Sequence, residues 1–226
     1  MVKFVENELQ TIKLEINGMW SLVVQQMENA FLAISTADRQ LADSVVTREK
    51  RVNAFELKID SDIEDFIALY NPVAIDLRFA LAMLNISNNL ERIGDYAESI
   101  ARFVLTTDIN DKCREIIELM QLSKMYETVI RMLNATYDAL KQRNIEAAKC
   151  ILEQDDTLDA MNHAALDNLT NYATEHPESV RLCLDLSAIF RKLERAGDHI
   201  NNLAEETIYY IDAEVVKHNR NKEVLE

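Results

Sequence analysis

The 226-residue chain has few of the residues that interrupt regular secondary structure, with 3 Gly and 2 Pro in all. Strand-rich folds need many turns, and turns are rich in Gly, Pro, Asn and Asp. The shortage therefore argues against a β-protein and favours a small number of long helices. The remaining composition, 48% hydrophobic and 28% charged residues, is that of an ordinary soluble globular protein.

The chain also lacks an excess of positive charge, because its formal net charge is −15 and its pI is about 4.7. A surface this acidic repels phosphate backbones, which argues against nucleic-acid binding and favours cationic partners or bound cations. Cysteines are scarce as well, and Cys113, Cys150 and Cys183 are scattered along the chain. We expect all three to be buried, reduced thiols.

No stretch of the chain is apolar enough to suggest a membrane span. The most apolar region, residues 66–86, contains Pro72, Asp76 and Arg78. It therefore falls short of the roughly 20 uninterrupted apolar residues that a span needs. The first residues show no basic segment followed by an apolar one, so we expect no signal peptide. The sequence thus predicts a soluble, cytoplasmic protein.

Motifs for the common catalytic chemistries are missing too. The sequence contains no Gly-x-x-x-x-Gly-Lys, Gly-x-Ser-x-Gly, His-Glu-x-x-His or Cys-x-x-Cys. It also lacks the Glu-x-x-His of ferritin-like di-iron bundles. We therefore expect a protein that is not an enzyme. A carboxylate–metal oxidase or hydrolase and a metal-binding or storage protein are the alternatives.

What the chain does contain is a helical repeat of apolar residues, at steps of three and four, through most of its length. Asp38 suits an N-cap, and Pro72 and Pro177 suit the first turn of a helix. The pattern predicts six long helices, with breaks near 35–38, at 71–72, across 106–111, near 142–144 and before 177. Helices of this length with short connections pack as antiparallel bundles.

The six predicted helices fall into two similar halves. Leu-Glu-Arg-x-Gly-Asp occurs at 90–95 and again at 193–198, and the prolines fall at corresponding places. Upstream, residues 52–53 match residues 158–159. The sequence therefore predicts an all-α protein built as a tandem repeat of two three-helix bundles, at residues 1–108 and 109–212, with a charged tail at 213–226.

Each half places carboxylates in rows along two of its helices. Glu91 and Asp95 are four residues apart, so they project from one face of their helix, and Glu98 continues the row. The predicted rows are Glu49, Asn53, Glu56 and Asp60 with Glu91, Asp95 and Glu98 in the first half, and Asp155, Asp159 and Asn162 with Glu194, Asp198, Asn201 and Glu205 in the second.

Two such rows facing one another need a compensating charge. A pair of carboxylates roughly 4 Å apart costs about 4 kcal/mol at an effective dielectric constant of about 20. A hard cation bound by oxygen atoms would offset this cost, as in the carboxylate sites of other helical bundles. The alternative is that Arg92 and Arg195 neutralise the acids and that the rows simply face water.

Two further features are open to a structural or a functional interpretation. Gly94 and Gly197 occupy equivalent places inside helices, where Gly costs about 1 kcal/mol relative to Ala. They serve either a close approach of two helices or room for a ligand beside the acids. His199 follows Asp198 and is either a further metal ligand or a histidine at or just below the surface.

With these residues placed, the chain resembles the PhoU family of phosphate-uptake regulators. The resemblance extends from the first helix to about Tyr210 and implies a pair of three-helix bundles, usually in a dimer. It rests on segments 71–78 (NPVAIDLR), 89–97 (NLERIGDYA) and 192–199 (KLERAGDH), with 49–53 (EKRVN) and 155–159 (DDTLD) as a second pair of acidic motifs.

The resemblance also implies metal clusters, of the iron, zinc or manganese class, held by paired E(D)-x-x-x-D motifs. Asn53 departs from the acidic pattern, so the first site is expected to be weaker or to draw on Glu56. Carried over by position, the implied ligands are Glu49, Asn53, Glu91 and Asp95, then Asp155, Asp159, Glu194 and Asp198, with Asp60, Glu98, His199 and Asn201 as further candidates.

In function, the resemblance implies a cytoplasmic negative regulator of phosphate uptake and of phosphate-responsive signalling. Such a protein couples the ATPase subunit of a phosphate ABC transporter to a sensor histidine kinase through protein–protein contacts. It catalyses nothing itself. The resemblance further implies a homodimer that does not bind nucleic acid and reaches the membrane through its partners only.

Overall fold

All of the regular structure is helical in the part of the chain that the computed structural model describes. This part comprises the backbone of residues 2–215 and the side chains of residues 4–154 and 156–215. It contains no strand, which confirms the predicted all-α class. The elements are α1 (Val2–Thr36), α2 (Arg39–Tyr70), α3 (Ile75–Thr106), α4 (Asp111–Leu119), α5 (Leu122–Gln142), α6 (Ile145–Leu152), α7 (Asp155–Glu175), the 3-10 turn η1 (Pro177–Ser179) and α8 (Val180–Asp212).

The first half forms a three-helix bundle of α1, α2 and α3, each packed against the other two. Asp38 caps α2 as predicted, since its carboxylate accepts a hydrogen bond from the backbone N–H of Leu41 at 2.9 Å. Asn71 ends α2 in the left-handed conformation, with φ 45°. The prediction that α3 begins at Pro72 was wrong by three residues, because Ala74 has φ 49° and cannot continue a right-handed helix.

The second half departs from the prediction of unbroken helices. The segment predicted as one helix over 113–141 is divided into α4 and α5 at Gln121, which has φ 55°. The segment predicted over 145–174 is divided into α6 and α7 by a tight turn in which the N–H of Gln154 donates to the carbonyl of Ile151. Neither break contains Gly or Pro, so the sequence carried no signal for it.

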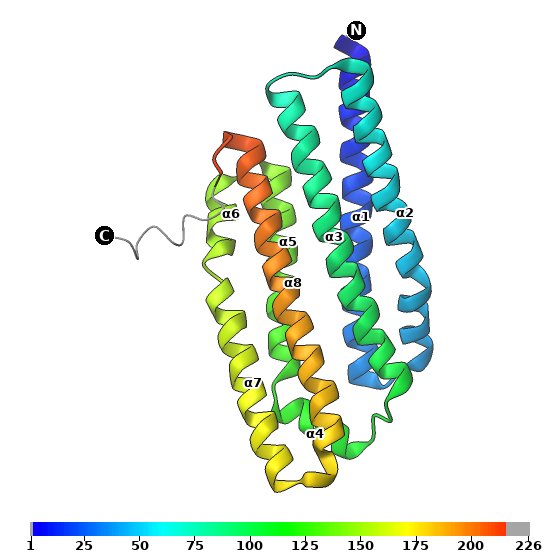
Figure 1. The fold of residues 1–226 in the computed structure, drawn as a ribbon, viewed down its shortest axis with the longest axis vertical. Coiled ribbons are helices and arrows are strands. Elements are labelled where there is room, and N and C mark those ends of the chain that lie inside the picture. Colours follow the sequence, from blue (N-terminus) through cyan, green and yellow to red (C-terminus); the bar gives the residue numbers. More distant parts are fainter. Residues whose placement is uncertain (1, 216–226) are drawn as a thin grey trace, which may run out of the picture.

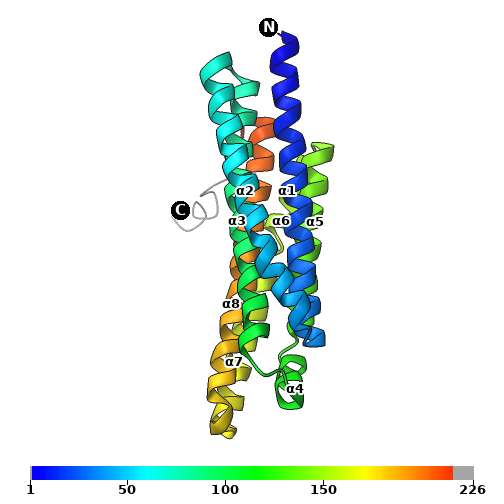
Figure 2. The same ribbon diagram turned by 90° about the vertical axis from the view of Figure 1, so that its right-hand side faces the viewer.

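The two halves lie side by side, with α3 and α8 packed against each other between them (Figure 1). A second line of contact runs between α1 and α5, which are adjacent when the molecule is turned by 90° (Figure 2). Here the ring of Trp20 lies 5.2 Å from the ring of Tyr137. The halves therefore share one continuous apolar core.

Two of the three cysteines are buried in the structure. Cys113 and Cys183 are buried free thiols, as predicted, whereas Cys150 is free but exposed, so the prediction was wrong for that residue. No helix among the described residues is long and apolar enough to cross a membrane. Most of the predicted charged tail, residues 216–226, lies outside the described residues.

Candidate functional site

Two of the three helical glycines, Gly94 and Gly197, lie where the helices that carry the acidic rows approach each other. A Cβ atom added to Gly94 would lie 3.1 Å from Cγ1 of Val52, and one added to Gly197 would overlap with Cδ1 of Leu158. The glycines therefore serve the close approach of α3 to α2 and of α8 to α7, and their positions leave no room for a ligand. The equivalent contacts also confirm that the halves repeat one another.

Adding a methyl group at Gly197 should therefore destabilise the protein. We expect Gly197→Ala to lower the free energy of unfolding by about 1–2 kcal/mol, because overpacking a core outweighs the better helix propensity of Ala. In a Leu158→Ala background the same substitution should be stabilising, since the space is then vacant. Urea denaturation of the four proteins tests this, and equal effects in both backgrounds would contradict it.

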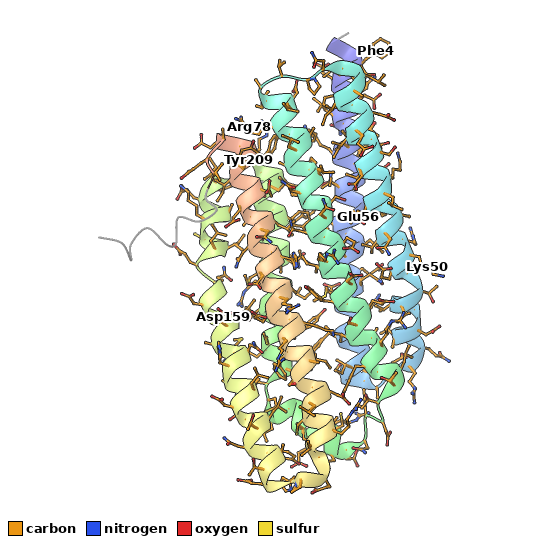
Figure 3. All side chains as sticks on the ribbon, viewed as in Figure 1. Phe4, Lys50, Glu56, Arg78, Asp159 and Tyr209 are labelled. Atoms are coloured by element: carbon orange, nitrogen blue, oxygen red, sulfur yellow. The ribbon has the colours of Figure 1, made fainter. Side chains whose placement is uncertain are left out.

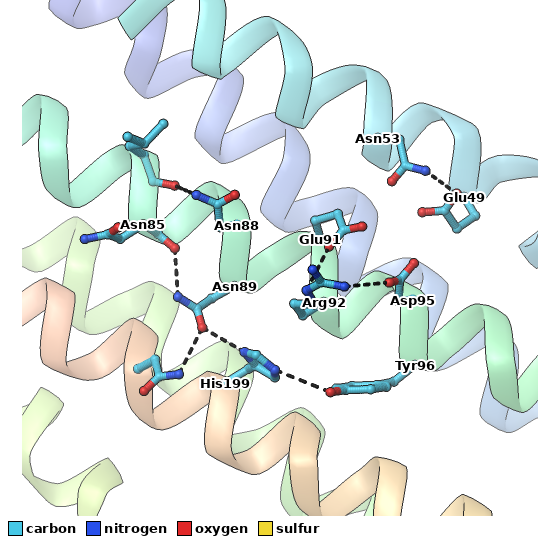
Figure 4. Close-up of polar contacts among 12 residues, drawn as sticks. Glu49, Asn53, Asn85, Asn88, Asn89, Glu91, Arg92, Asp95, Tyr96 and His199 are labelled. Atoms are coloured by element: carbon cyan, nitrogen blue, oxygen red, sulfur yellow. Dashed lines mark hydrogen bonds and ion pairs between the residues drawn. The ribbon is translucent and has the colours of Figure 1, made fainter. Parts of the chain in front are cut away.

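In the first half, Glu49 and Asn53 on α2 face Glu91 and Asp95 on α3 (Figure 4). Glu49 is 6% exposed, and its Oε2 accepts a hydrogen bond of 2.9 Å from Nδ2 of Asn53. The other oxygen atoms of this pair, Oε1 of Glu49 and Oδ1 of Asn53, are buried without a hydrogen-bond partner among the described residues. Two buried oxygen acceptors therefore lie beside the acidic residues of α3, and neither receives a hydrogen bond from a described residue.

Burial and mutual repulsion raise the pKa values of these carboxyl groups. Burial first, and then the charges of Asp95 and Glu56, raise the pKa of Glu91 from 4.5 to about 7. Burial, followed by the charge of Asp95, also raises the pKa of Glu49. Because Asp95 of α3 raises the pKa of Glu49 on α2, and Glu56 of α2 raises that of Glu91 on α3, these carboxyl groups form one electrostatic cluster across the interface of the two helices.

The predicted extensions of this cluster divide into two kinds. Glu56 and Asp60 belong to it, since burial raises both pKa values, the charge of Asp60 acts on Glu56, and Oδ1 of Asp60 is buried without a hydrogen-bond partner. Glu98 lies at its edge, where it forms an ion pair of 2.6 Å with Arg102. Glu56 can therefore contribute an oxygen ligand more directly than Glu98.

Arg92 neutralises the cluster only in part. Its guanidinium lies 3.6 Å from Glu91 and 3.5 Å from Asp95, but the side chain is 61% exposed. The Glu91 side chain beneath it is 15% exposed, so the acidic row does not simply face water. Asp95 and Glu98 also line an open groove of about 630 Å³ between α3 and α8, whose α8 side carries Arg191, Lys192 and Arg195.

In the second half, the contact between Gly197 and Leu158 sets Asp159 on α7 beside the α8 residues that flank the glycine. Asp159 and Glu194 are half-buried, Asp198 is exposed and Asn201 is buried. Asp155 begins α7, and its side chain lies outside the described residues. The backbone arrangement of the predicted second site thus repeats that of the first.

Both ring nitrogens of His199 form hydrogen bonds in the interface between the halves. Its Nδ1 donates a hydrogen bond of 2.8 Å to Oδ1 of Asn89, and its Nε2 accepts one of 3.4 Å from the hydroxyl of Tyr96 (Figure 4). Burial and the charges of Arg92 and Arg195 lower the pKa of the imidazole. Sequence reasoning missed the link to Asn89, because the two residues are 110 positions apart and share no local pattern.

The donor set of the first cluster fits a hard cation. The available ligands are oxygen atoms, three of the buried ones have no hydrogen-bond partner among the described residues, and the surrounding carboxyl groups have raised pKa values. As the described side chains lie, no group of three or more His, Cys, Asp or Glu converges closely enough to hold a metal ion. Loading the site would therefore require side-chain rotation.

The chain is similar to several known proteins over nearly its whole length. The phosphate-specific transport system accessory protein PhoU homolog of Xylella fastidiosa (strain 9a5c) is 30% identical over 95% of this chain and 89% of its own. That of Aquifex aeolicus (strain VF5) is 32% identical over 96% of each. The crystal structure of PhoU from Pseudomonas aeruginosa matches with a TM-score of 0.83 and 28% identity, covering 92% of this chain and 99% of that one.

The family model described as the PhoU domain matches twice, at residues 16–104 and at residues 122–207. One match includes the contact of Gly94 with Val52 and the other the equivalent contact of Gly197 with Leu158, so the sequence repeat, the packing repeat and the family repeat coincide. The chain belongs to the PhoU family.

Proposed function

We propose that this protein is a cytoplasmic, non-catalytic negative regulator of phosphate uptake and of phosphate-responsive signalling. The observation that carries the proposal is the PhoU domain in both halves, together with relatives named as accessory proteins of phosphate-specific transport systems. The absence of common catalytic motifs from the sequence supports a role exerted through contacts. The partners we propose are the ATPase subunit of a phosphate ABC transporter and a sensor histidine kinase, bound by a homodimer.

Deletion of the gene tests this role. In a strain without the protein, phosphate uptake and phosphate-responsive transcription should stay high when phosphate is plentiful, and the wild-type gene should restore repression. Tagged protein should also retain the transporter ATPase and the kinase from cells grown in high phosphate. Uptake and transcription that do not change on deletion would show that the proposed role is wrong.

The proposal includes a metal at each acidic cluster, with iron, zinc and manganese as candidates. Glu49, Asn53, Glu91 and Asp95 would hold it in the first half, and the ligands in the second would be Asp155, Asp159, Glu194 and Asp198. A bound cation would place positive charge within the cluster, whereas the exposed guanidinium of Arg92 neutralises the carboxylates only from the solvent side. The chain's own carboxylates would thereby be kept ionised, and the α2–α3 and α7–α8 pairs would be joined more firmly.

Elemental analysis tests the metal sites. Protein purified without chelators should contain bound metal, and a variant with Ala at Glu91, Asp95, Glu194 and Asp198 should have lost most of it, because each site loses half of its proposed ligands. Glu127→Ala, at an exposed position on α5, is the matched control and should keep the metal. Equal metal content in all three proteins would leave only the interpretation of acids without a metal.

A further inference from the structure

A second candidate site lies at the junction of the two halves, away from the residues proposed to bind metal. It is a pocket of about 230 Å³ between α1, α3, the end of α5 and the end of α8. Its lining includes Lys13, Lys141 and Arg143 and no carboxylate. In a chain with 39 acidic and 24 basic residues, this is a local reversal of the overall charge.

Aromatic rings hold two of these cations. Nζ of Lys13 lies 5.3 Å from the ring centre of Phe79, and Cζ of Arg143 lies 5.1 Å from that of Tyr210. Arg143 also donates a hydrogen bond to the hydroxyl of Tyr210, and the two rings pack edge to face at 5.4 Å. A ring attracts a cation without cancelling its charge, whereas a carboxylate would neutralise it.

The third cation and an amide complete the pocket. Nζ of Lys141 lies 4.9 Å from the ring centre of Tyr137, whose hydroxyl donates a hydrogen bond of 3.1 Å to Oδ1 of Asn17. Asn17 also lines the pocket, and its NH₂ group is a hydrogen-bond donor. The polar groups around the pocket are thus mostly donors.

None of the three cations forms an ion pair with a carboxylate in the described part of the chain. In contrast, Lys58, Arg102 and Lys112 each lie within 2.8 Å of an acidic oxygen. The charge at the pocket is therefore available to a ligand from solution. Arg143 offers a planar fork that matches two oxygens of one anion, and the lysines offer point charges beside it.

We propose that this pocket binds a small, multiply charged phosphate anion, with inorganic phosphate and pyrophosphate as the chemical class. The volume is below the range of about 300–1,000 Å³ usual for drug-sized ligands, so a whole nucleotide does not fit inside. The proposal goes beyond the function proposed above and does not depend on it, because it uses neither the acidic clusters nor a partner protein.

Binding here would also join the two halves. The anion would contact α1 and α3 of the first half and α5 and α8 of the second. Nearby, Arg78 of α3 reaches the end of α8 beside Tyr209, where its Nε donates a hydrogen bond of 3.2 Å to the carbonyl of Tyr210 (Figure 3). A ligand in the pocket therefore adds to a link that the fold already makes, and it should stabilise the association of the halves.

Isothermal titration calorimetry of the full chain with inorganic phosphate and with pyrophosphate, at constant ionic strength, tests the proposal. Lys13→Gln and Arg143→Gln should each weaken binding by about tenfold or more, as expected when a hydrogen bond to a charged group is lost. Lys50→Gln, on the outer surface of α2 (Figure 3), is the matched control and should bind like the wild type.

Three outcomes would overturn the proposal: no saturable binding at millimolar phosphate or pyrophosphate, equal affinity in all four proteins, or loss of binding in Glu91→Gln with retention in Arg143→Gln. The last would place the anion at the acidic cluster. An ATP titration separates the sources of the phosphate group. Tighter binding of pyrophosphate than of ATP supports a free anion, whereas tighter binding of ATP would overturn that assignment. A thermal shift with phosphate that Arg143→Gln abolishes gives an independent readout.

Discussion

Replacing Glu91 with Gln should make the metal-free protein more stable near pH 8, by roughly 2–3 kcal/mol. The Glu91 side chain is 15% exposed, and burial together with Asp95 and Glu56 raises its pKa from 4.5 to about 7. Near pH 8 the wild-type protein therefore carries a charge that the folded state disfavours. Gln keeps almost the same shape and removes that charge.

The same substitution should flatten the dependence of stability on pH. A carboxyl group whose pKa is higher in the folded state binds its proton more tightly there, so the free energy of unfolding falls as the pH rises. For Glu91 this fall begins near pH 4.5 and is complete a little above pH 7. Because the pKa values of Glu49, Glu56 and Asp95 are raised as well, mild acid should stabilise the whole metal-free cluster.

Urea denaturation with a chelator present, near pH 5 and near pH 8, measures both effects. Glu127→Gln is the matched control, since substitution of an exposed residue usually changes stability by less than about 0.5 kcal/mol. If Glu91→Gln were less stable than the wild type near pH 8, or kept the full pH dependence, the cluster would not be strained by its own charge.

Adding manganese or zinc should reverse the order of the two proteins near pH 8. A ligand that binds only the folded state stabilises it in proportion to the logarithm of its concentration relative to Kd. The wild type should gain more than Glu91→Gln, because Gln offers a neutral amide where the site needs a charged oxygen. Equal gains would mean that the metal binds without Glu91.

The helices of the first half could be predicted from the sequence because their signals are local. The apolar periodicity, the Asp38 cap and the stop at Asn71 each lie within a few residues of the boundary they set. The breaks that separate α4 from α5 and α6 from α7 have no such signal. Gln121 adopts a positive φ without being Gly or Asn, so tertiary packing must impose that conformation.

The candidate site was predictable only along each helix. A spacing of four places Glu91 and Asp95 on one face, but which helix lies opposite depends on packing. The glycine at 94 was the sequence signal for that packing, since it marks where Val52 approaches. The anion pocket had no signal of this kind, because Lys13 lies near the start of the chain and Lys141 and Arg143 lie beyond its midpoint, so that they meet only in the folded protein.

Trp20→Ala should have the largest effect on stability of any single substitution considered, lowering the free energy of unfolding by about 3–5 kcal/mol. The indole is 0% exposed and packs at 5.2 Å against the ring of Tyr137, so its loss leaves a cavity where α1 meets α5. Leu14→Ala, on the same helix but 61% exposed, is the matched control and should cost little.

The same residue reports on whether the halves unfold together. Trp20 is the single tryptophan of the chain, so its fluorescence follows the junction of α1 and α5, while far-UV circular dichroism follows all helices. In the wild type we expect both signals to give one midpoint in urea, because the core is continuous across the junction. A fluorescence transition that clearly precedes the loss of helix would contradict this and show that the halves separate first.

Tyr137 also holds Lys141 and Asn17 at the anion pocket, so Trp20→Ala should weaken phosphate binding without removing any group that contacts the anion.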